Sequence, residues 1–217
     1  MFRLDTILKG LPFLLRGAEA TLFVSVLALL LGMGVGLVLA LMRISRFGPL
    51  RFASGFMVDV LRSTPLLVQL MWIFFALPIV TGVALSPIAA GVLGLGLYAG
   101  AYLSEVYRGG ILAIPSGQWQ ASQALGMTTP QLLSRIILPQ ALVRVLPPMA
   151  SLWISMLKES ALVSAVSVEE LMWRGASLAA FTLRPVETFT ATAALYFAIT
   201  YPFAIVANVL HRRYLTH

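Results

Sequence analysis

Polar side chains interrupt the apolar stretches of this sequence at a few positions, and these positions are where it could do chemistry. Ser63 and Thr64 precede Pro65, and Glu159 precedes Ser160. A proline removes a backbone hydrogen bond, so a helix through Pro65 should kink or break and free peptide groups beside the two hydroxyls. Such a break inside a membrane is a common way to bind a small polar solute. The sequence therefore predicts a polar binding site rather than a continuous apolar helix at this point.

Charged residues near these positions have a plainer interpretation as well. Charges within a membrane span cost about 2.5–3.5 kcal/mol each on insertion scales, so they require partners or a function. Asp59 and Arg62 lie near the predicted break, and Lys158 precedes Glu159. These side chains could lie at the lipid–water interface or pair with one another. Serines at 160, 164 and 167 favour a wet, polar wall around Glu159 instead.

The composition places these residues in an integral membrane protein. Of the 217 residues, 59% are hydrophobic and 11% are charged, against about 25% charged in soluble domains. The absence of cysteine excludes disulfides, zinc–thiolate sites and thiol catalysis. The fold class expected is all-α.

Runs of about 20 apolar residues predict about five transmembrane helices. The expected spans are roughly 19–42, 56–80, 88–107, 140–157 and 187–210. We expect an interfacial N-terminal segment at 1–16, with its helix at 3–15, a transmembrane domain at 17–211, and a tail at 212–217. Residues 160–168 could form a short re-entrant piece. Gly32 and Gly36 form a G-x-x-x-G pattern, which predicts close helix packing.

The arginines are distributed unevenly along the chain, which predicts its orientation. If the polar loop 108–139 is cytoplasmic and the spans alternate, eight arginines and no acidic residue lie inside. They are Arg43, Arg46, Arg51, Arg108, Arg135, Arg144, Arg212 and Arg213. Basic and acidic residues balance on the outer side. We therefore expect the N-terminus outside and the C-terminus in the cytoplasm, and topology rather than nucleic-acid binding accounts for the net charge of +7.

The longest polar interval runs from Gln118 to Pro139 and contains a pattern of its own. Small residues cluster on a short helical stretch, Gly126 can end that helix, and Pro130 suits the first turn of another. It resembles the E-A-A loop of ATP-binding-cassette importer permeases, in which E-A-A is followed by a glycine and then by I-x-L-P. The spacing here matches, with Gln120-Ala121-Ser122, Gly126 and Ile136-Ile137-Leu138-Pro139. Gln120 replaces the acidic residue, and Ser122 replaces the second alanine.

Four further segments, in the right order along the chain, resemble permeases of the polar amino-acid class. The segments 62–69, 101–110, 137–141 and 157–164 resemble R-G-T-P-L-L-V-Q, A-Y-x-x-E-x-x-R-G-G, I-L-P-Q-A and L-K-D-T-S-L-V-S. Ser63 stands where the family has glycine. The resemblance covers about residues 17–211, essentially the whole chain.

This resemblance implies a type I importer permease fold in the bacterial inner membrane, with a cytoplasmic coupling-helix loop. Two permease subunits, identical or related, would line the pathway, and an external binding protein would deliver a polar amino acid or a derivative such as an opine. A cytoplasmic ATPase dimer would dock on the loop. The coupling residues would be Gln120, Ala121, Ser122, Gly126, Ile136 and Pro139.

By the same resemblance, Ser63, Thr64, Glu159 and Ser160 would contact the substrate. Glu159 would suit an ammonium or another cationic group, and the broken backbone with its two hydroxyls would suit the α-carboxylate. The partner subunit could instead be the one that holds the substrate. The chain has no G-x-x-x-x-G-K-[ST], so ATP and magnesium would be bound by the ATPase, with no cofactor or metal on this chain.

Two other classes of protein remain as alternatives. Glu169-Glu170 and Arg174 match the E-E-x-x-x-R of intramembrane prenyl-protein proteases, but the only histidines, His211 and His217, lie in the terminal tail. A secondary transporter for a small polar solute would run without ATP and should show an inverted repeat, and none is visible.

Overall fold

A computed structural model of the chain describes the backbone of residues 4–215 and the side chains of residues 5–209, and that part consists of helices and short connections. The long helices are α1 (Leu4–Ile44), α2 (Gly48–Ser63), α5 (Pro87–Leu112), α8 (Leu138–Glu159) and α10 (Pro185–Leu215). The shorter α-helices are α3 (Leu66–Met71), α4 (Leu77–Thr81), α6 (Ser116–Ala124), α7 (Thr129–Leu132) and α9 (Leu171–Thr182). Two π-helical turns, η1 (Trp72–Ala76) and η2 (Leu133–Ile137), and a 3₁₀ helix, η3 (Ser160–Val166), complete them.

The described helices confirm the expected membrane architecture. Four helical stretches are long and apolar enough to cross a membrane, and the bent pair formed by residues 48–63 and 66–81 makes a fifth if it counts as one span. The first helix is longer than expected, because α1 runs without a break from Leu4 through the described part of the predicted interfacial segment. The interfacial position of that segment stays a prediction. Of the predicted terminal segments, residues 1–3 and 216–217 lie outside the described residues.

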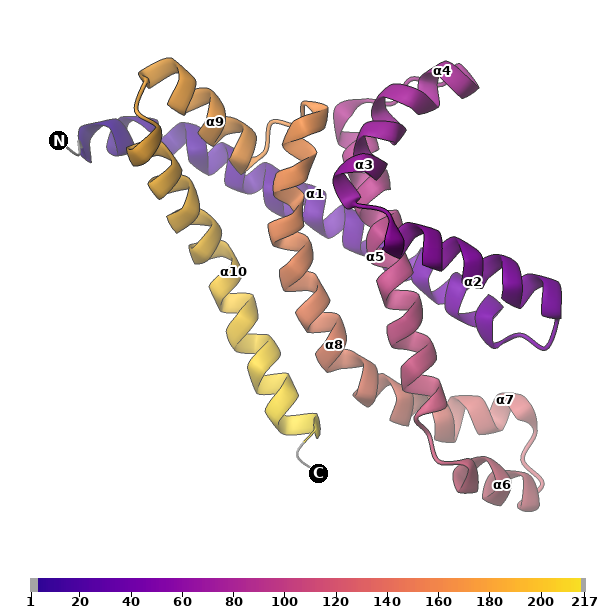
Figure 1. The fold of residues 1–217 in the computed structure, drawn as a ribbon. Coiled ribbons are helices and arrows are strands. Elements are labelled where there is room, and N and C mark those ends of the chain that lie inside the picture. The colour runs from indigo at the N-terminus through magenta and orange to yellow at the C-terminus, as the bar shows by residue number, and fades with distance from the viewer. Residues whose placement is uncertain (1–3, 216–217) are drawn as a thin grey trace.

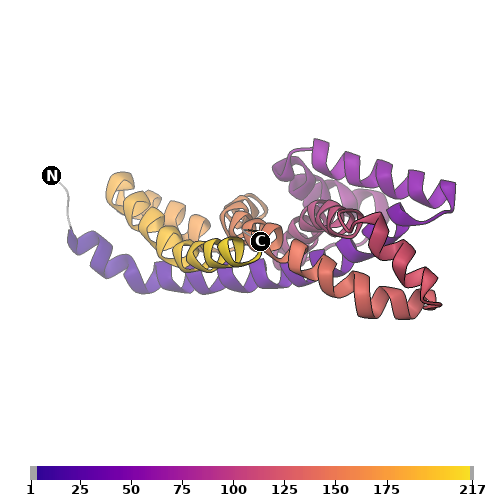
Figure 2. The same cartoon turned by 90° about the horizontal axis from the view of Figure 1, so that it is seen from below.

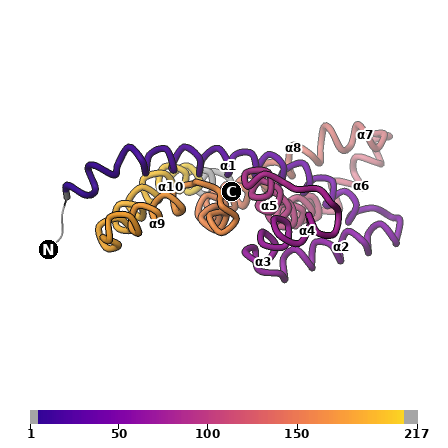
Figure 3. Tube along the Cα trace, turned by 90° about the horizontal axis from the view of Figure 1, so that it is seen from above, coloured from indigo at the N-terminus to yellow at the C-terminus, as the bar shows by residue number. Residues whose placement is uncertain are grey.

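The packing of α1 against α5 forms the spine of the molecule. The two helices touch through glycines, as predicted for Gly32 and Gly36: a Cβ added at Gly32 would lie 2.7 Å from that of Ala99, and one added at Gly36 would lie 2.9 Å from the carbonyl oxygen of Gly100. Backbones can come this close only where side chains are absent. Figures 2 and 3 show α1 extending along most of the molecule, with α9 and α10 beside it toward one end and α5 and α2 toward the other.

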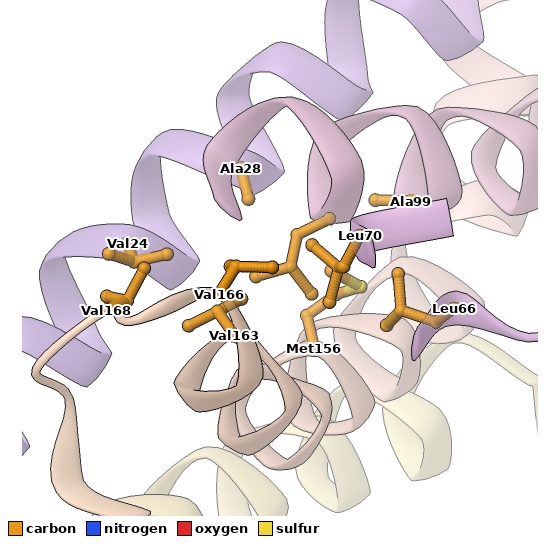
Figure 4. Packing of buried hydrophobic residues seen from close by; sticks show 10 residues of the cluster. Val24, Ala28, Leu66, Leu70, Ala99, Met156, Val163, Val166 and Val168 are labelled. Carbon is orange, nitrogen blue, oxygen red and sulfur yellow. The ribbon is translucent and has the colours of Figure 1, made fainter. Parts of the chain in front are cut away.

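The largest buried cluster lies where the broken second span meets the end of α8. Leu66 and Leu70 of α3 pack there with Met156 of α8 and with Val163 and Val166 of η3, as Figure 4 shows. The segment predicted as re-entrant is therefore a 3₁₀ helix that contributes to the core. Its position in the membrane stays a prediction. This cluster holds the two predicted substrate segments in one region.

Several element boundaries differ from those expected from the sequence. The connection between the expected spans 19–42 and 56–80 is shorter than predicted, since α1 continues to Ile44 and α2 already begins at Gly48. The polar interval 108–139 is mostly helical, and α5 continues into it as far as Leu112. Between η3 and α10 lies α9, a helix that was not predicted from the sequence. Glu170 caps α9 by accepting hydrogen bonds from the backbone N–H groups of Met172 and Trp173.

Candidate substrate site and coupling loop

The helix break predicted at Pro65 is present, and side chains hold it in place. The helices on its two sides are bent by 105°, and Thr64 is extended, as the residue before a proline usually is. The Thr64 hydroxyl donates to the carbonyl oxygen of Val60 at 2.8 Å. The side-chain nitrogen of Gln69 donates to the carbonyl oxygens of Leu61 at 2.7 Å and Thr64 at 2.9 Å. The break is therefore a fixed feature, with its freed carbonyl groups capped.

The other predicted substrate residues differ in accessibility. Ser63 is exposed at the end of α2, and Glu159 is half-buried at the end of α8. Ser160 is fully buried, and its hydroxyl donates to the carbonyl oxygen of Leu157 at 2.8 Å. A solute could reach Ser160 only after the end of α8 moves. In this conformation, Glu159 is the accessible polar group of the pair.

One face of α5 connects the helix break with Glu159. Tyr98, Tyr102 and Glu105 follow at helical spacing, so they lie along the same face. Tyr98 packs against the buried cluster that contains Met156 and Val163, on the two sides of Glu159 in the sequence, and the rings of Tyr98 and Tyr102 are 4.8 Å apart between centroids. The Arg62 guanidinium, next to Ser63, lies 5.1 Å from the centroid of the Tyr102 ring. The structure thus places both predicted substrate segments along one polar stripe.

The two tyrosines of this stripe were not among the residues chosen from the sequence. They could have been found from the segment Ala101-Tyr102-Leu103-Ser104-Glu105, together with the tyrosine one helical turn earlier, Tyr98. Spaced four and three residues apart, these side chains had to share a helix face. What the sequence could not supply was which neighbouring helix the face meets.

Glu105, at the far end of the stripe, is the centre of a charge network. It pairs with Arg43 of α1, with Arg108 of α5 at 2.8 Å, and with Arg62 of α2 at 3.6 Å. Of the two alternatives for the charges near the break, pairing applies to Arg62, whose partner is Glu105, while Asp59 is exposed with no ion pair in the described part of the chain. One carboxylate therefore joins three helices at the end of α5 that leads into the coupling loop.

The predicted coupling residues lie on the helical loop formed by α6 and α7. Gln120 and Ala121 are exposed on α6. Ser122 is 4% exposed, and its hydroxyl donates to the carbonyl oxygen of Gln118 at 2.7 Å. Of these two small residues, Ala121 thus faces outward and Ser122 does not. A small residue is needed at 122 because it packs inside the loop.

The turn between α6 and α7 follows the sequence prediction. Gly126 has φ of +73°, a left-handed conformation that glycine adopts without cost, and it ends α6. Pro130 lies in the first turn of α7, and the backbone N–H of Thr128 donates to the side-chain oxygen of Gln131 at 3.0 Å, as in a capping box. The loop is therefore shaped by local chemistry.

The other end of the loop is anchored to the transmembrane helices. Ile114, Leu132 and Ile137 form a buried cluster inside the loop, and Ile136 packs against it. Pro139 is exposed just after the π-helical turn η2, which ends at Ile137. Because a proline cannot donate a backbone hydrogen bond, a wider turn before it relieves the helix.

A long-range hydrogen bond fixes the base of the loop. Arg144 of α8 donates to the carbonyl oxygen of Ala113, just after α5, at 2.8 Å. Figure 1 shows α6 and α7 standing apart from the other helices, at the end of the molecule where α5 stops and α8 begins. The loop is thus a packed unit that can move with α5 and α8.

The acidic pair considered for a protease has structural partners instead. Glu170 is fully buried and accepts hydrogen bonds from Tyr196 at 2.6 Å and Thr21 at 3.2 Å, besides those from the start of α9. Glu169 pairs with Arg174 at 2.9 Å. Within the described residues, no group of three or more histidine, cysteine or acidic side chains could hold a metal ion.

Comparison with known proteins agrees with this geometry. The family model described as "Binding-protein-dependent transport system inner membrane component" matches residues 32–216. The chain belongs to this family. It is 37% identical to the L-cystine transport system permease protein TcyB of Bacillus subtilis (strain 168), over 93% of this chain and 86% of that protein. It is 34% identical to the glutamine transport system permease protein GlnP of Escherichia coli (strain K12), over 98% of this chain and 97% of that protein.

A solved structure supports the same assignment at the level of the fold. A crystal structure titled "an amino acid ABC transporter with histidines" superimposes with a TM-score of 0.91, at 33% identity, covering 98% of this chain and 99% of the matching one. The resemblance drawn from the E-A-A-like loop and the four other segments is confirmed. The chain has the type I importer permease fold.

Proposed function

We propose that this chain is a permease subunit that moves a polar amino acid, or a close derivative, into the cytoplasm by alternating access, driven by ATP. The observation that carries this proposal is the convergence of a broken span and a half-buried carboxylate on one polar stripe of α5. Sites of this kind suit zwitterionic solutes, because the unpaired backbone N–H groups at a helix start can meet the negative charge and a carboxylate can meet the positive one. Membership of a family whose relatives include permeases named for cystine and glutamine supports an amino acid as the solute.

Within this site, Ser63 faces the α-carboxylate, and Glu159 faces a cationic group, usually the α-ammonium. Thr64 joins Ser63 only after its hydroxyl leaves the carbonyl oxygen of Val60. Ser160 joins the site only in a conformation in which the end of α8 has moved, because its hydroxyl is buried here. Arg62 lies beside Ser63 and is partly exposed, which adds a positive charge at the carboxylate end.

The coupling loop receives a cytoplasmic ATPase dimer, which binds ATP and magnesium; this chain binds neither. Exposed Gln120 and Ala121 lie on α6, and Leu125, at its end, is 81% exposed. A small helix with short side chains fits into a groove on the ATPase. Because the loop packs onto the ends of α5 and α8, a movement of the ATPase is transmitted to these transmembrane helices. A second permease subunit and an external binding protein complete the importer.

The proposed orientation places the coupling loop in the cytoplasm and the N-terminus outside. Arg43, Arg62 and Arg108 gather around Glu105 at the end of α5 that leads into the loop. A positive excess at this end agrees with the positive-inside rule. Figure 1 also shows the described end of α10 at the same end of the molecule as α6 and α7.

Co-purification tests the coupling. Tagged chain extracted in mild detergent from its native cells should bring along an ATPase with a Walker motif. Replacing Gly126 with valine should reduce the recovered ATPase about tenfold, because a left-handed backbone costs a β-branched residue roughly 1–2 kcal/mol and displaces the end of α6.

The matched control is Gly109→Val, an exposed glycine of α5 with open space around it and no left-handed backbone. It should recover the ATPase as the unchanged chain does. If the chain purifies alone under these conditions, the result favours a secondary transporter over an ATP-driven importer. Equal loss in the two variants would remove the role assigned to the Gly126 turn.

A further inference from the structure

Arg62 is the most loosely held of the three arginines around Glu105. The Arg108 guanidinium donates two hydrogen bonds to Glu105, at 2.8 and 3.0 Å, and that of Arg43 donates another. The Arg62 guanidinium lies 3.6 Å from the same carboxylate, beyond hydrogen-bond distance, and donates no hydrogen bond to the described part of the chain. The Arg62 side chain is also the most exposed, at 40%, against 35% for Arg108 and 17% for Arg43. Arg62 can therefore leave Glu105 without leaving that carboxylate unpaired.

The charges around Glu105 favour an added anion. Three guanidinium groups surround one carboxylate, which leaves an excess of two positive charges in this cluster. Asp59, one turn before Arg62, is exposed and forms no ion pair with them in the described part of the chain. A guanidinium can bind a carboxylate through two parallel hydrogen bonds. Arg62 presents an accessible guanidinium for this purpose, one residue before Ser63.

We propose that Arg62 exchanges Glu105 for the α-carboxylate of the bound amino acid, and that this exchange signals an occupied site to the coupling loop. The proposal rests on the proposed function, since it takes the solute to be an amino acid bound at the helix break. All amino acids carry an α-carboxylate, whatever their side chain. The exchange therefore suits residues of the segments 62–69 and 101–110, which resemble those of polar amino-acid permeases as a class.

The ring of Tyr102 stabilises Arg62 while it changes partner. The Arg62 guanidinium lies 5.1 Å from the centroid of this ring, and the face of an aromatic ring attracts a cation. Tyr102 is one helical turn before Glu105 on α5, and Arg62 directly precedes Ser63 on α2. The guanidinium therefore keeps a favourable contact when it leaves Glu105.

The exchange removes a charged link between α2 and α5. The contact that remains between these helices is apolar, because Val58 and Leu61 of α2 pack with Ala101 of α5 in one buried cluster. Apolar contacts are not directional, so they tolerate a small shift of one helix along the other. Since α5 leads into the coupling loop, the Arg62–Glu105 pair holds α5 to α2 while the site is empty. A bound carboxylate releases α5 to move with the loop, because it binds Arg62 only in the released state.

A comparison of amino acids with the amines that lack their α-carboxylate tests the exchange. The permease–ATPase complex is purified in lipid nanodiscs without the external binding protein, so that the measured affinity is that of the permease. The ligand pairs are L-glutamine and γ-aminobutyramide, L-arginine and agmatine, and L-cystine and cystamine. The amino acid that binds most tightly should bind at least about tenfold more tightly than its amine, the discrimination expected of a charge-assisted hydrogen bond.

Three variants separate the contact with Arg62 from a general loss of structure. Arg62→Gln should weaken binding of that amino acid about tenfold and leave binding of its amine within about twofold, because only the acid has a group for Arg62 to bind. Damage to the site would weaken both ligands. Arg62→Lys keeps the charge and should keep part of the preference for the acid. Arg51→Gln changes an exposed arginine of α2 that has no ion pair in the described part of the chain, and it should leave both affinities unchanged.

The ATPase activity of the complex with its external binding protein tests the signal. In the unchanged complex and in Arg51→Gln, a saturating amino acid should raise the rate of ATP hydrolysis. Arg62→Gln should raise the rate measured without amino acid and abolish the further increase, because α2 is already released from α5. A merely structural role for Arg62 would instead lower both rates.

Equal weakening of the acid and the amine by Arg62→Gln, or no effect on either, would overturn the exchange. Normal stimulation of the ATPase in Arg62→Gln would overturn the signal. ATP-driven uptake by the unchanged complex with its binding protein distinguishes these failures from that of the proposed function. If an amino acid is taken up while the binding test fails, only the role of Arg62 is lost. If the complex takes up no amino acid with ATP, the proposed function itself is wrong.

Discussion

Replacing Gly36 with valine is expected to prevent the recovery of folded protein. A Cβ at this position would lie 2.8 Å from the Cβ of Leu103 and 2.9 Å from the carbonyl oxygen of Gly100. Neither neighbour can move away easily, because one is backbone and the other is the first carbon of a buried side chain. Overpacking of a tight interior costs about 1–3 kcal/mol, and contact with a facing backbone places this case at about 3 kcal/mol or more. The measurement is the yield and thermal midpoint of monodisperse protein in detergent.

Gly34 provides the matched control on the same helix. It lies two residues away, and a Cβ added there would meet nothing within 4 Å. Gly34→Val makes the same change in helix propensity without an overlap, so its yield and thermal midpoint should stay close to those of the unchanged protein. Equal damage by the two substitutions, or none by Gly36→Val, would contradict the close packing of α1 on α5.

The second large effect is expected for Glu170→Ala. The Glu170 carboxylate connects three helices: it caps the start of α9 and accepts hydrogen bonds from Thr21 of α1 and Tyr196 of α10. Burial raises the pKa of Glu170 above its ordinary value, and the hydrogen bonds donated to it oppose that rise. Removing the carboxyl group would leave these buried donors unpaired. We expect a loss of about 3–5 kcal/mol in the free energy of unfolding, seen as a lower thermal midpoint.

Glu169→Ala is the control for this change, on the adjacent residue. The Glu169 side chain is 58% exposed and pairs with Arg174 at the surface, a contact worth about 0.2–1 kcal/mol. Tyr196→Phe should fall between the two, because it removes a single donor from Glu170. If Glu169→Ala proves as damaging as Glu170→Ala, the connection between the three helices is not what stabilises this end of the molecule.

Much of this fold could be predicted because the local signals were strong. The span count follows from apolar length, and the bend at Thr64-Pro65 follows from the missing proline N–H and the steric restriction on the residue before it. The turn at Gly126 and the start of α7 at Pro130 follow from equally local rules. The spacing of Gly32 and Gly36 predicted a close helix contact, but it did not predict that the partner helix is α5.

The rest depends on which faces meet, and a single sequence does not determine that. Arg62 could have paired with Asp59 one turn away, but it turns to Glu105 because α2 lies alongside α5. Ser122 and Ala121 are neighbouring small residues in the sequence, but the loop folds back on itself and buries only Ser122. In the sequence, Gln69 was only the last residue of the segment 62–69, and the structure shows that its amide spans the helix break. Glu170 likewise resembled half of a protease signature until its partners from two distant helices were known.

The most direct test of the central claim is amino-acid uptake by the chain reconstituted in liposomes with its ATPase and binding protein. The account predicts that labelled glutamine accumulates only when ATP and the ATPase are both present, and that proton or sodium gradients have no effect. Accumulation by the permease alone under an ion gradient, with no response to ATP, would contradict it.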